Sequence, residues 1–363
     1  NAVNGVTNIL TKDGRETQGA VITGGFGSEE QGFGGVRYGG TLAENWYYRV
    51  YAKGFNRDDF PEESGLEGGD EWCQQREGFR IDWFPTDENQ LTIQGDYYYG
   101  RSGDRVIIAT ENPPFSESVY EKGKATGINL LGRWSKQLSE SSDYSLQLYY
   151  DRNERENAVL DAEIDSFDAD FQLRLRLFER NNVLWGLGYR LISDQIGGTY
   201  SATYIPEARQ DQVFSAFIQD EIEVLREQFY VTPGVKIEHN DYTGWEFQPS
   251  IRGLYKLTPE QSLWAAVSRT VRTPARFEHS SLAHVAVPRI PNVTARIDGN
   301  EQFESEELIA YEVGYRNQLL EQLFVDVAVF YNDYNKLRTS ERGTPILRAP
   351  VLLPITYGNM LEG

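Results

Sequence analysis

Residues 171–177 read Phe-Gln-Leu-Arg-Leu-Arg-Leu, and this strict alternation of apolar and polar residues decides the fold class. Successive side chains of an extended strand point to opposite faces, so this stretch has one apolar and one charged face. The same period of two recurs in residues 91–99, 144–151, 229–238 and 323–331. The repeated pattern predicts an all-β protein whose strands separate an apolar environment from a polar one.

The connections between the predicted strands alternate in length. Short turns are predicted near residues 41–45, 85–89, 137–142, 179–182, 224–227, 258–261 and 317–321. Long connections are predicted near residues 58–71, 101–121, 152–160, 192–210, 273–302 and 336–351, and only 26–31 and 240–246 are brief on this side. Short turns at one end and long loops at the other are typical of outer-membrane barrels. The sequence therefore predicts an antiparallel transmembrane β-barrel with roughly sixteen strands present, and a soluble β-sandwich or solenoid is the alternative.

The composition fits this barrel and excludes several classes of function. The chain has 55 acidic against 35 basic residues and a net charge of -20, which argues against a nucleic-acid partner. The single cysteine, Cys73, allows no internal disulfide and has no companion at metal-ligand spacing, so we expect no metal site and no cofactor. The mean hydropathy of -0.54 is compatible with a barrel because only alternate residues face lipid. The aromatic content of 13% suits the aromatic girdles of such barrels.

The opening segment, residues 1–12, resembles the end of the plug domain of TonB-dependent outer-membrane receptors. It reads Asn-Ala-Val-Asn-Gly-Val-Thr-Asn-Ile-Leu-Thr-Lys, and the likeness rests on Asn4, Gly5, Asn8 and Thr11. Thr7 departs from the family pattern, which usually has isoleucine there. Residues 263–276 and 299–316, which include Tyr-Glu-Val-Gly-Tyr-Arg at 311–316, are similar to barrel segments of the same family.

The resemblance implies a barrel of about 22 strands with a plugged lumen. Residues 1–18 would be the C-terminal end of the plug domain, and residues 19–363 a barrel that is incomplete at its C-terminus and lacks about six strands. The last residues, 359–363, look like the start of the next strand. We therefore expect two unpaired strand edges in this chain.

A receptor of this kind lies in the outer membrane of a Gram-negative bacterium and imports a scarce nutrient. The implied partners are the TonB energy-transducing complex, which would act on the missing N-terminus of the plug, a ferric chelate or similar small ligand, and outer-membrane lipid and lipopolysaccharide. A ferric siderophore is the leading cargo, with haem, cobalamin and glycans as alternatives. A passive porin and an adhesin are the alternatives outside the family. No enzyme is predicted, because adjacent carboxylates such as Glu306 and Glu307 are typical of solvated loops or turns.

Candidate ligand-binding residues fall in two of the long connections. An anionic chelate could be held through charge-assisted hydrogen bonds by Arg101, Arg105 and Tyr120 in one connection and by Arg272, Arg276 and Arg289 in another. The same side chains could instead pair with acidic residues or with lipopolysaccharide phosphates. His279 and His284 fall in the connection where haem-importing relatives carry a ligand histidine. The alternative is a pair of exposed loop histidines without a partner.

The polar faces of the strands predict a charged lumen. Its expected members are Asp96, Arg174, Arg176, Lys236, Glu238, Arg252 and Asp326. Glycines in the first two predicted strands, within residues 24–27 and 32–35, are expected to leave room for a nearby backbone, possibly that of the plug.

Overall fold

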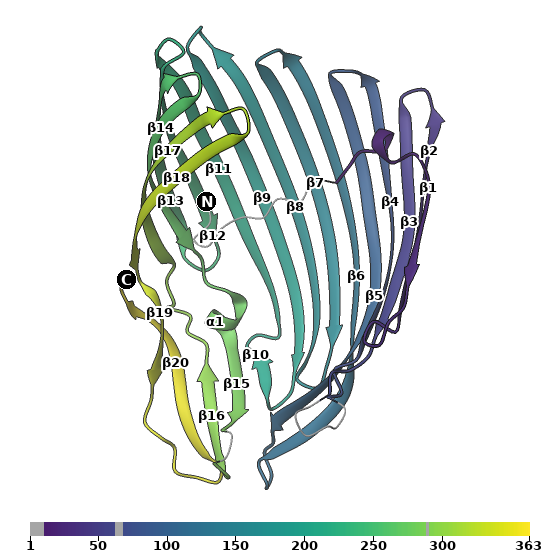
Figure 1. Ribbon diagram of the computed structural model, residues 1–363. Coiled ribbons are helices and arrows are strands. Elements are labelled where there is room, and N and C mark those ends of the chain that lie inside the picture. The colour runs from purple at the N-terminus through teal and green to yellow at the C-terminus, as the bar shows by residue number, and fades with distance from the viewer. Residues whose placement is uncertain (1–10, 62–67, 288–289) are drawn as a thin grey trace.

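Fifteen strands form one antiparallel sheet that curves into an open trough (Figure 1). The computed structural model describes residues 11–61, 68–287 and 290–363. Each strand of the large sheet pairs with its neighbours in the order β1–β9, β11–β14, β17 and β18. The all-β, antiparallel barrel architecture predicted from the alternation is confirmed, with fifteen strands in the main sheet in place of roughly sixteen.

The strands of the large sheet are long, and most run unbroken along their partners. Their bounds are β1 Gly19–Gly25, β2 Gly32–Ala43, β3 Trp46–Arg57, β4 Trp72–Thr86, β5 Asn89–Ala109, β6 Ser116–Ser139, β7 Ser142–Glu156, β8 Leu160–Leu177, β9 Asn181–Gly198, β11 Ala208–Leu225, β12 Phe229–Asn240, β13 Gly244–Thr258, β14 Gln261–Arg272, β17 Glu306–Leu320 and β18 Leu323–Asn335. A single 3-10 turn, Arg15–Thr17, precedes β1.

The alternating residues separate as the pattern predicts. Leu148, Leu187 and Phe247 lie on the convex face and are 45%, 52% and 56% exposed. In a soluble domain such side chains would be buried, whereas in a membrane barrel they face lipid. Aromatic pairs flank this apolar band near the short turns: Trp46 with Trp83, Trp134 with Tyr144, and Phe229 with Tyr255.

The short turns gather at one end of the trough and the longer connections at the other (Figure 1). We call these the short-turn end and the long-loop end. Each predicted short turn is present. The connections predicted at 101–121, 152–160 and 192–210 are shorter than expected, because the flanking strands continue well into them. The period-two pattern weakens there, while backbone pairing between the strands does not.

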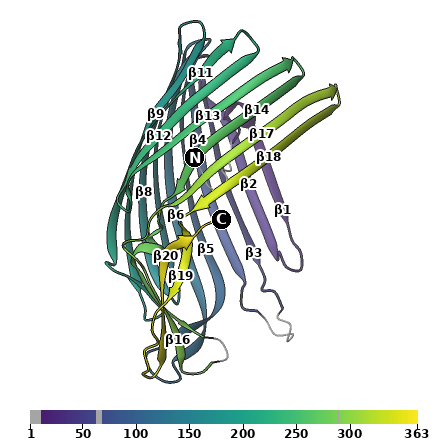
Figure 2. The same cartoon turned by 90° about the vertical axis from the view of Figure 1, so that its left-hand side faces the viewer.

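A second sheet of five strands stands at the long-loop end (Figures 1 and 2). Its order is β10-β15-β16-β20-β19, with bounds β10 Ala202–Tyr204, β15 Ser281–Ala286, β16 Val293–Asp298, β19 Leu337–Arg342 and β20 Val351–Leu361. A short helix, α1 (Arg276–Ser280), leads into β15. Three connections therefore build one sheet, in which β16 and β20 pair in parallel. The prediction that 359–363 begin the next barrel strand is wrong for residues 359–361, which belong to β20 in this second sheet. Gly363, however, exchanges two backbone hydrogen bonds of 2.7 and 3.0 Å with Tyr334 of β18, at the edge where the next barrel strand would pair.

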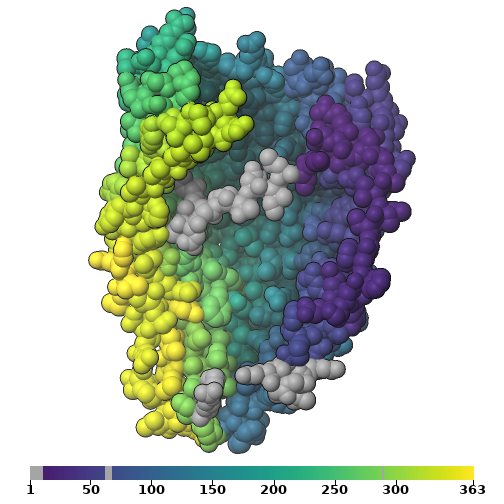
Figure 3. All heavy atoms as spheres, viewed as in Figure 1, coloured from purple at the N-terminus to yellow at the C-terminus, as the bar shows by residue number. Residues whose placement is uncertain are grey.

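The large sheet has two open edges. Among the described residues, β1 pairs only with β2, and β18 pairs with β17 and, at Tyr334 alone, with Gly363. Figure 3 shows the hollow concave face between these two edges. This agrees with the expectation of two unpaired strand edges.

Candidate functional site

A buried carboxylate holds the long-loop end together. Glu278 of α1 is 2% exposed, and its Oε1 lies 2.9 Å from Nη2 of Arg272 and 3.0 Å from Nη1 of Arg338. Arg272 also contacts Glu306 at 2.7 Å. Burial raises the pKa of Glu278, but hydrogen bonds from Arg272 and from the Ala275 N–H outweigh burial and hold it below its ordinary value. Arg272, a predicted ligand-binding residue, is thus engaged by two carboxylates.

The sequence predicted that the adjacent carboxylates Glu306 and Glu307 lie in a solvated loop or turn, and the structure contradicts this prediction. Both residues lie in β17 and form ion pairs, Glu306 with Arg272 and Glu307 with Arg269 at 3.1 Å and Lys336 at 3.2 Å. The prediction was wrong because the basic partners come from strands distant in sequence.

Arg276 joins α1 to the inner wall. Its Nε lies 2.9 Å from Asp194, its Nη2 donates to the Pro206 carbonyl, and its guanidinium lies 5.3 Å from the Tyr204 ring. Nη1 is buried and has no hydrogen-bond partner among the described residues. Arg276 therefore mainly stabilises the contact between α1 and the inner wall. Its Nη1 group is the one donor of this guanidinium without a partner among the described residues. Arg289 lies outside the described residues.

His279 is half-buried and has several partners, so its interpretation as an exposed loop histidine without a partner was wrong. Its Nδ1 lies 2.7 Å from Ser280 Oγ and 3.2 Å from Nη1 of Arg209. Its ring packs edge-on to Tyr242 at 5.1 Å, and the Tyr242 hydroxyl donates to Asp211. Burial first, and then the charge of Arg209, lower the pKa of His279 below its ordinary value.

His284 also has a partner. Its ring stacks on that of Tyr200 with 4.2 Å between centroids and 5° between planes, and its Nδ1 lies 2.9 Å from the Tyr200 carbonyl. Both predicted histidines therefore serve the packing of the connections through their Nδ1 atoms.

Arg101, Arg105 and Tyr120 lie on strands β5 and β6, not in an irregular loop. By alternation the two arginines share the face of β5 that carries the exposed Ile93, which is the convex face. Arg105 and Tyr120 are cross-strand neighbours, and the Tyr120 hydroxyl donates to Glu71 at 2.6 Å. The structure thus groups these three residues with one another and places them on the convex face, away from the trough.

The segment before β1 is pinned to the inner wall by an ion pair. Asp82 is 0% exposed and receives Nε and Nη2 of Arg80 at 2.7 and 2.8 Å. It also accepts the N–H of Gly14 and the hydroxyl of Thr92, both at 2.7 Å. Arg80 in turn donates to the Thr11 hydroxyl at 2.9 Å. Of the resembling residues in the opening segment, Thr11 is thus placed on this wall, while Asn4, Gly5 and Asn8 lie outside the described residues.

Close packing reinforces this attachment. Thr17 is 2% exposed, and a side chain at Gly39 would overlap its carbonyl. The guanidinium of Arg15 lies 3.7 Å from the centroid of the Phe84 ring. The first two strands therefore do make room for a nearby backbone through a glycine, although the one that matters is Gly39 and not those of 24–27 or 32–35.

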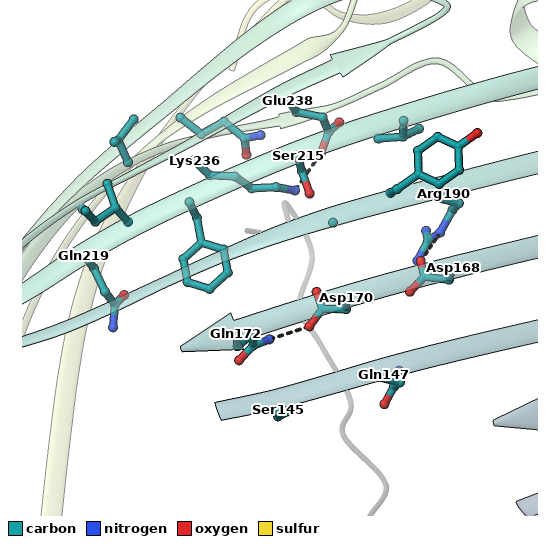
Figure 4. A pocket seen from close by; sticks show the side chains of 18 of the residues that line it. Ser145, Gln147, Asp168, Asp170, Gln172, Arg190, Ser215, Gln219, Lys236 and Glu238 are labelled. Atoms are coloured by element: carbon teal, nitrogen blue, oxygen red, sulfur yellow. Dashed lines mark hydrogen bonds and ion pairs between the residues drawn. The ribbon is translucent and has the colours of Figure 1, made fainter. Parts of the chain in front are cut away.

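The middle of the inner wall is polar. A cavity of about 710 Å³ on the concave face is lined by strands β6 to β13, and Figure 4 shows Lys236, Glu238, Asp168 and Arg190 among its side chains. Lys236 pairs with Glu238 at 2.7 Å and Arg190 with Asp168 at 2.9 Å. The predicted charged lumen is confirmed for Lys236 and Glu238 here, and for Arg174 and Arg252 in a neighbouring cavity of about 490 Å³.

The described part of the chain contains neither a cluster of metal ligands nor a membrane-spanning helix. No group of three or more His, Cys, Asp or Glu side chains there could hold a metal ion. No helix there is long and apolar enough to cross a membrane.

Comparison with known proteins identifies the architecture. The family model described as "TonB dependent receptor-like, beta-barrel" matches residues 14–360. The chain belongs to this family. Among curated proteins, the TonB-dependent barrel is similar to the ferric enterobactin receptor of Pseudomonas aeruginosa, with 25% identity over 93% of this chain and 53% of that protein. The chain therefore spans about half the length of that relative.

Solved structures share the fold of this TonB-dependent barrel. The siderophore receptor PirA of P. aeruginosa superposes with a TM-score of 0.72 at 13% identity, covering 94% of this chain and 60% of that one. The hemophore receptor HasR of Serratia marcescens, solved with its hemophore HasA and heme, gives a TM-score of 0.74 at 12% identity and covers 97% and 61%. At these identities the likeness concerns the fold alone.

Sequence reasoning missed two of the buried carboxylates of this barrel, Asp82 and Glu278, which are the least exposed carboxylates among the described residues. For Asp82 a signal existed, because Arg80 and Asp82 are opposite charges two residues apart on the polar face of one strand. Glu278 carried no such signal, since Arg272 and Arg338 meet it only after the connections have folded together.

Proposed function

We propose that this chain is part of a receptor that imports a ferric siderophore across the outer membrane of a Gram-negative bacterium, using energy from the TonB complex. The match of the TonB-dependent barrel family over residues 14–360 carries the proposal. The likeness to a ferric enterobactin receptor supports iron chelates as the cargo. In this assignment the long-loop end faces the outside and the short-turn end the periplasm.

The attached segment supports an assignment of residues 1–18 to the end of a plug, with the barrel in residues 19–363. Thr11 and Gly14 are fixed to the wall through Arg80 and Asp82, as expected where a plug joins the first barrel strand. A passive porin would have no plug, so an attachment of this kind inside the lumen would have no explanation. Because Arg101 and Arg105 share the convex face, the proposal assigns them to lipopolysaccharide phosphates rather than to the cargo. No catalytic role and no nucleic-acid partner are part of the proposal.

Haem and cobalamin are weaker candidates for the cargo. No observation on this chain favours a porphyrin or a corrin ring, whereas the curated relative is a ferric enterobactin receptor. The HasR likeness is one of fold only.

Transport assays test the function. The full-length gene is expressed in an iron-starved strain that lacks its own receptors, and uptake of iron-55 is followed for a ferric tris-catecholate, a ferric tris-hydroxamate and haem. We expect uptake of a siderophore complex that stops when a protonophore collapses the proton gradient or when TonB is deleted. Uptake that persists under both conditions would mean a passive pore, and uptake of haem alone would replace the proposed cargo.

A further inference from the structure

A small recess lies on the inner wall of β1–β4, toward the long-loop end. It has a volume of about 340 Å³, and its lining includes Phe33, Lys53, Phe55 and Arg76. Phe33 and Phe55 are cross-strand neighbours on β2 and β3. Lys53 and Phe55 share the face of β3 with Arg49, which donates to the carbonyl of Lys12 inside the trough. The recess is therefore part of the lumen and faces away from lipid.

The floor of the recess is a fixed set of rings. Phe55 packs edge-on against Trp72 with 4.4 Å between centroids. The guanidinium of Arg57 lies 4.7 Å from the Phe55 ring and 4.6 Å from the Trp72 ring, and pairs with Glu30 at 3.1 Å. Rings clamped in this way offer flat apolar surface with little loss of side-chain freedom on binding.

Phe33 completes the floor because its neighbour is a glycine. A Cβ atom at Gly25 would lie 2.6 Å from Cε1 of Phe33. Any larger residue at position 25 would push this ring out of its place. The glycine thus lets the Phe33 ring lie against the backbone of β1.

The lining of the recess carries two cations, Lys53 and Arg76, and one carboxylate, Glu30, which pairs with Arg57. The ammonium of Lys53 has no carboxylate partner among them, and its recorded contact is the Tyr51 ring at 6.0 Å. Arg76 pairs with Asp96 at 3.2 Å, yet its Nε is buried without a hydrogen-bond partner. Lys236 and Arg190 across the trough, like Arg76, each pair with a carboxylate, so Lys53 is the cation of the recess that has no carboxylate partner in the described chain.

We propose that this recess is a subsite for one anionic aryl group of the cargo, such as a catecholate arm of a ferric chelate. The ring would pack on Phe33 and Phe55, and its anionic oxygen would meet the ammonium of Lys53. The volume of about 340 Å³ lies at the low end of the ~300–1,000 Å³ typical of small-molecule pockets, which fits one arm and not a whole chelate. The inference rests on the proposed function and narrows its substrate class to anionic aromatic chelates.

The experiment compares two ferric complexes on the purified full-length receptor. The probes are a ferric tris-catecholate, which is anionic and aromatic, and a ferric tris-hydroxamate, which is neutral and has no aryl group. Lys53→Met removes the charge and keeps the length of the side chain. Lys256→Met is the matched control, because Lys256 also lies over a tyrosine ring, Tyr230 at 4.9 Å, but belongs to β13.

We expect Lys53→Met to weaken binding of the catecholate complex about tenfold, the loss typical of one charge-assisted hydrogen bond, and to leave hydroxamate binding unchanged. Phe55→Leu should lower catecholate affinity in the same selective way, and Lys256→Met should change neither affinity. A Lys53→Cys variant in a Cys73→Ser background adds a direct readout. Its alkylation should be slowed by the catecholate complex and not by the hydroxamate complex.

Three outcomes would overturn the inference. Equal losses for both probes would mean that the recess packs against another part of the receptor, such as the plug. Unchanged catecholate binding together with unprotected alkylation would mean that the cargo does not enter the recess. If the unmodified receptor bound neither complex, the proposed function would fall with the inference, whereas in the first two cases the function would stand.

Discussion

Replacing Asp82 by alanine should release the segment that precedes β1 from the inner wall. Asp82 accepts hydrogen bonds from Arg80, Gly14 and Thr92, and neither it nor Arg80 is more than 9% exposed. Removing one partner of a buried ion pair costs about 3–5 kcal/mol, because the other charge stays buried and unpaired. Arg80 would keep its hydrogen bonds to the Thr11 hydroxyl and to Gln94, so the lower figure applies.

A loss of about 3 kcal/mol corresponds to an opening of the segment that is roughly 150-fold more frequent. Hydrogen exchange followed by mass spectrometry on the full-length receptor measures it, in peptides that cover residues 11–18. Exchange there should accelerate by about this factor, while peptides from β8 and β9 should not change. The double variant Arg80→Met with Asp82→Leu removes both the acceptor of the Gly14 N–H and the donor to the Thr11 hydroxyl, so exchange in residues 11–18 should be at least as fast as in Asp82→Ala. Exchange in residues 11–18 that is the same in Asp82→Ala as in the unmodified receptor would refute the anchoring role.

Three further predictions concern the barrel wall and the long-loop end. Leu148→Arg on the convex face should cost about 2–4 kcal/mol and reduce the heat-modifiable folded fraction, while Gln147→Arg on the concave face should be tolerated. Gly39→Ala should displace the segment before β1 at a cost of about 1–3 kcal/mol, seen as faster hydrogen exchange in residues 11–18, whereas Gly132→Ala, with nothing within 4 Å, should have no effect. The folded-state pKa of Glu278 lies below its ordinary value of 4.5, so its stabilising contribution is present above that value and is lost as the pH falls through the lowered pKa. Limited proteolysis of residues 273–302 should therefore accelerate only in strong acid, and a Glu278→Gln variant should be cleaved quickly already at neutral pH.

The barrel strands could be predicted because their signal is local. A strand that separates lipid from a polar lumen must alternate at every residue, and residues 171–177 do so without reference to any partner. The short turns follow from the same pattern, since they fall where the alternation stops. The ends of strands β5 to β11 were misjudged because beyond the membrane the alternation is no longer enforced, although hydrogen bonding between strands continues.

The second sheet and the buried ion pairs could not be predicted in the same way. Strand β16 pairs in parallel with β20, and neither short segment carries a sequence pattern that identifies the other as its partner. The environment of His279 likewise depends on Arg209 and Tyr242, which reach it from other strands. Contacts of this kind appear only once distant connections have been brought to the same end of the barrel.

The inner wall of the first strands carries two kinds of charge, and the difference bears on how the receptor works. Near the short-turn end, Arg80 and Asp82 satisfy one another and the backbone of the preceding segment, and Arg49 donates to the carbonyl of Lys12, so these side chains hold that segment. Toward the long-loop end, Arg76 pairs with Asp96, whereas Lys53 has no carboxylate partner in the described chain. Satisfied charge makes a permanent joint, whereas unmatched charge remains available for a ligand that arrives and leaves. On the same strands, the Arg80–Asp82 pair therefore anchors the segment before β1, whereas the unpaired charge of Lys53 is available to the cargo.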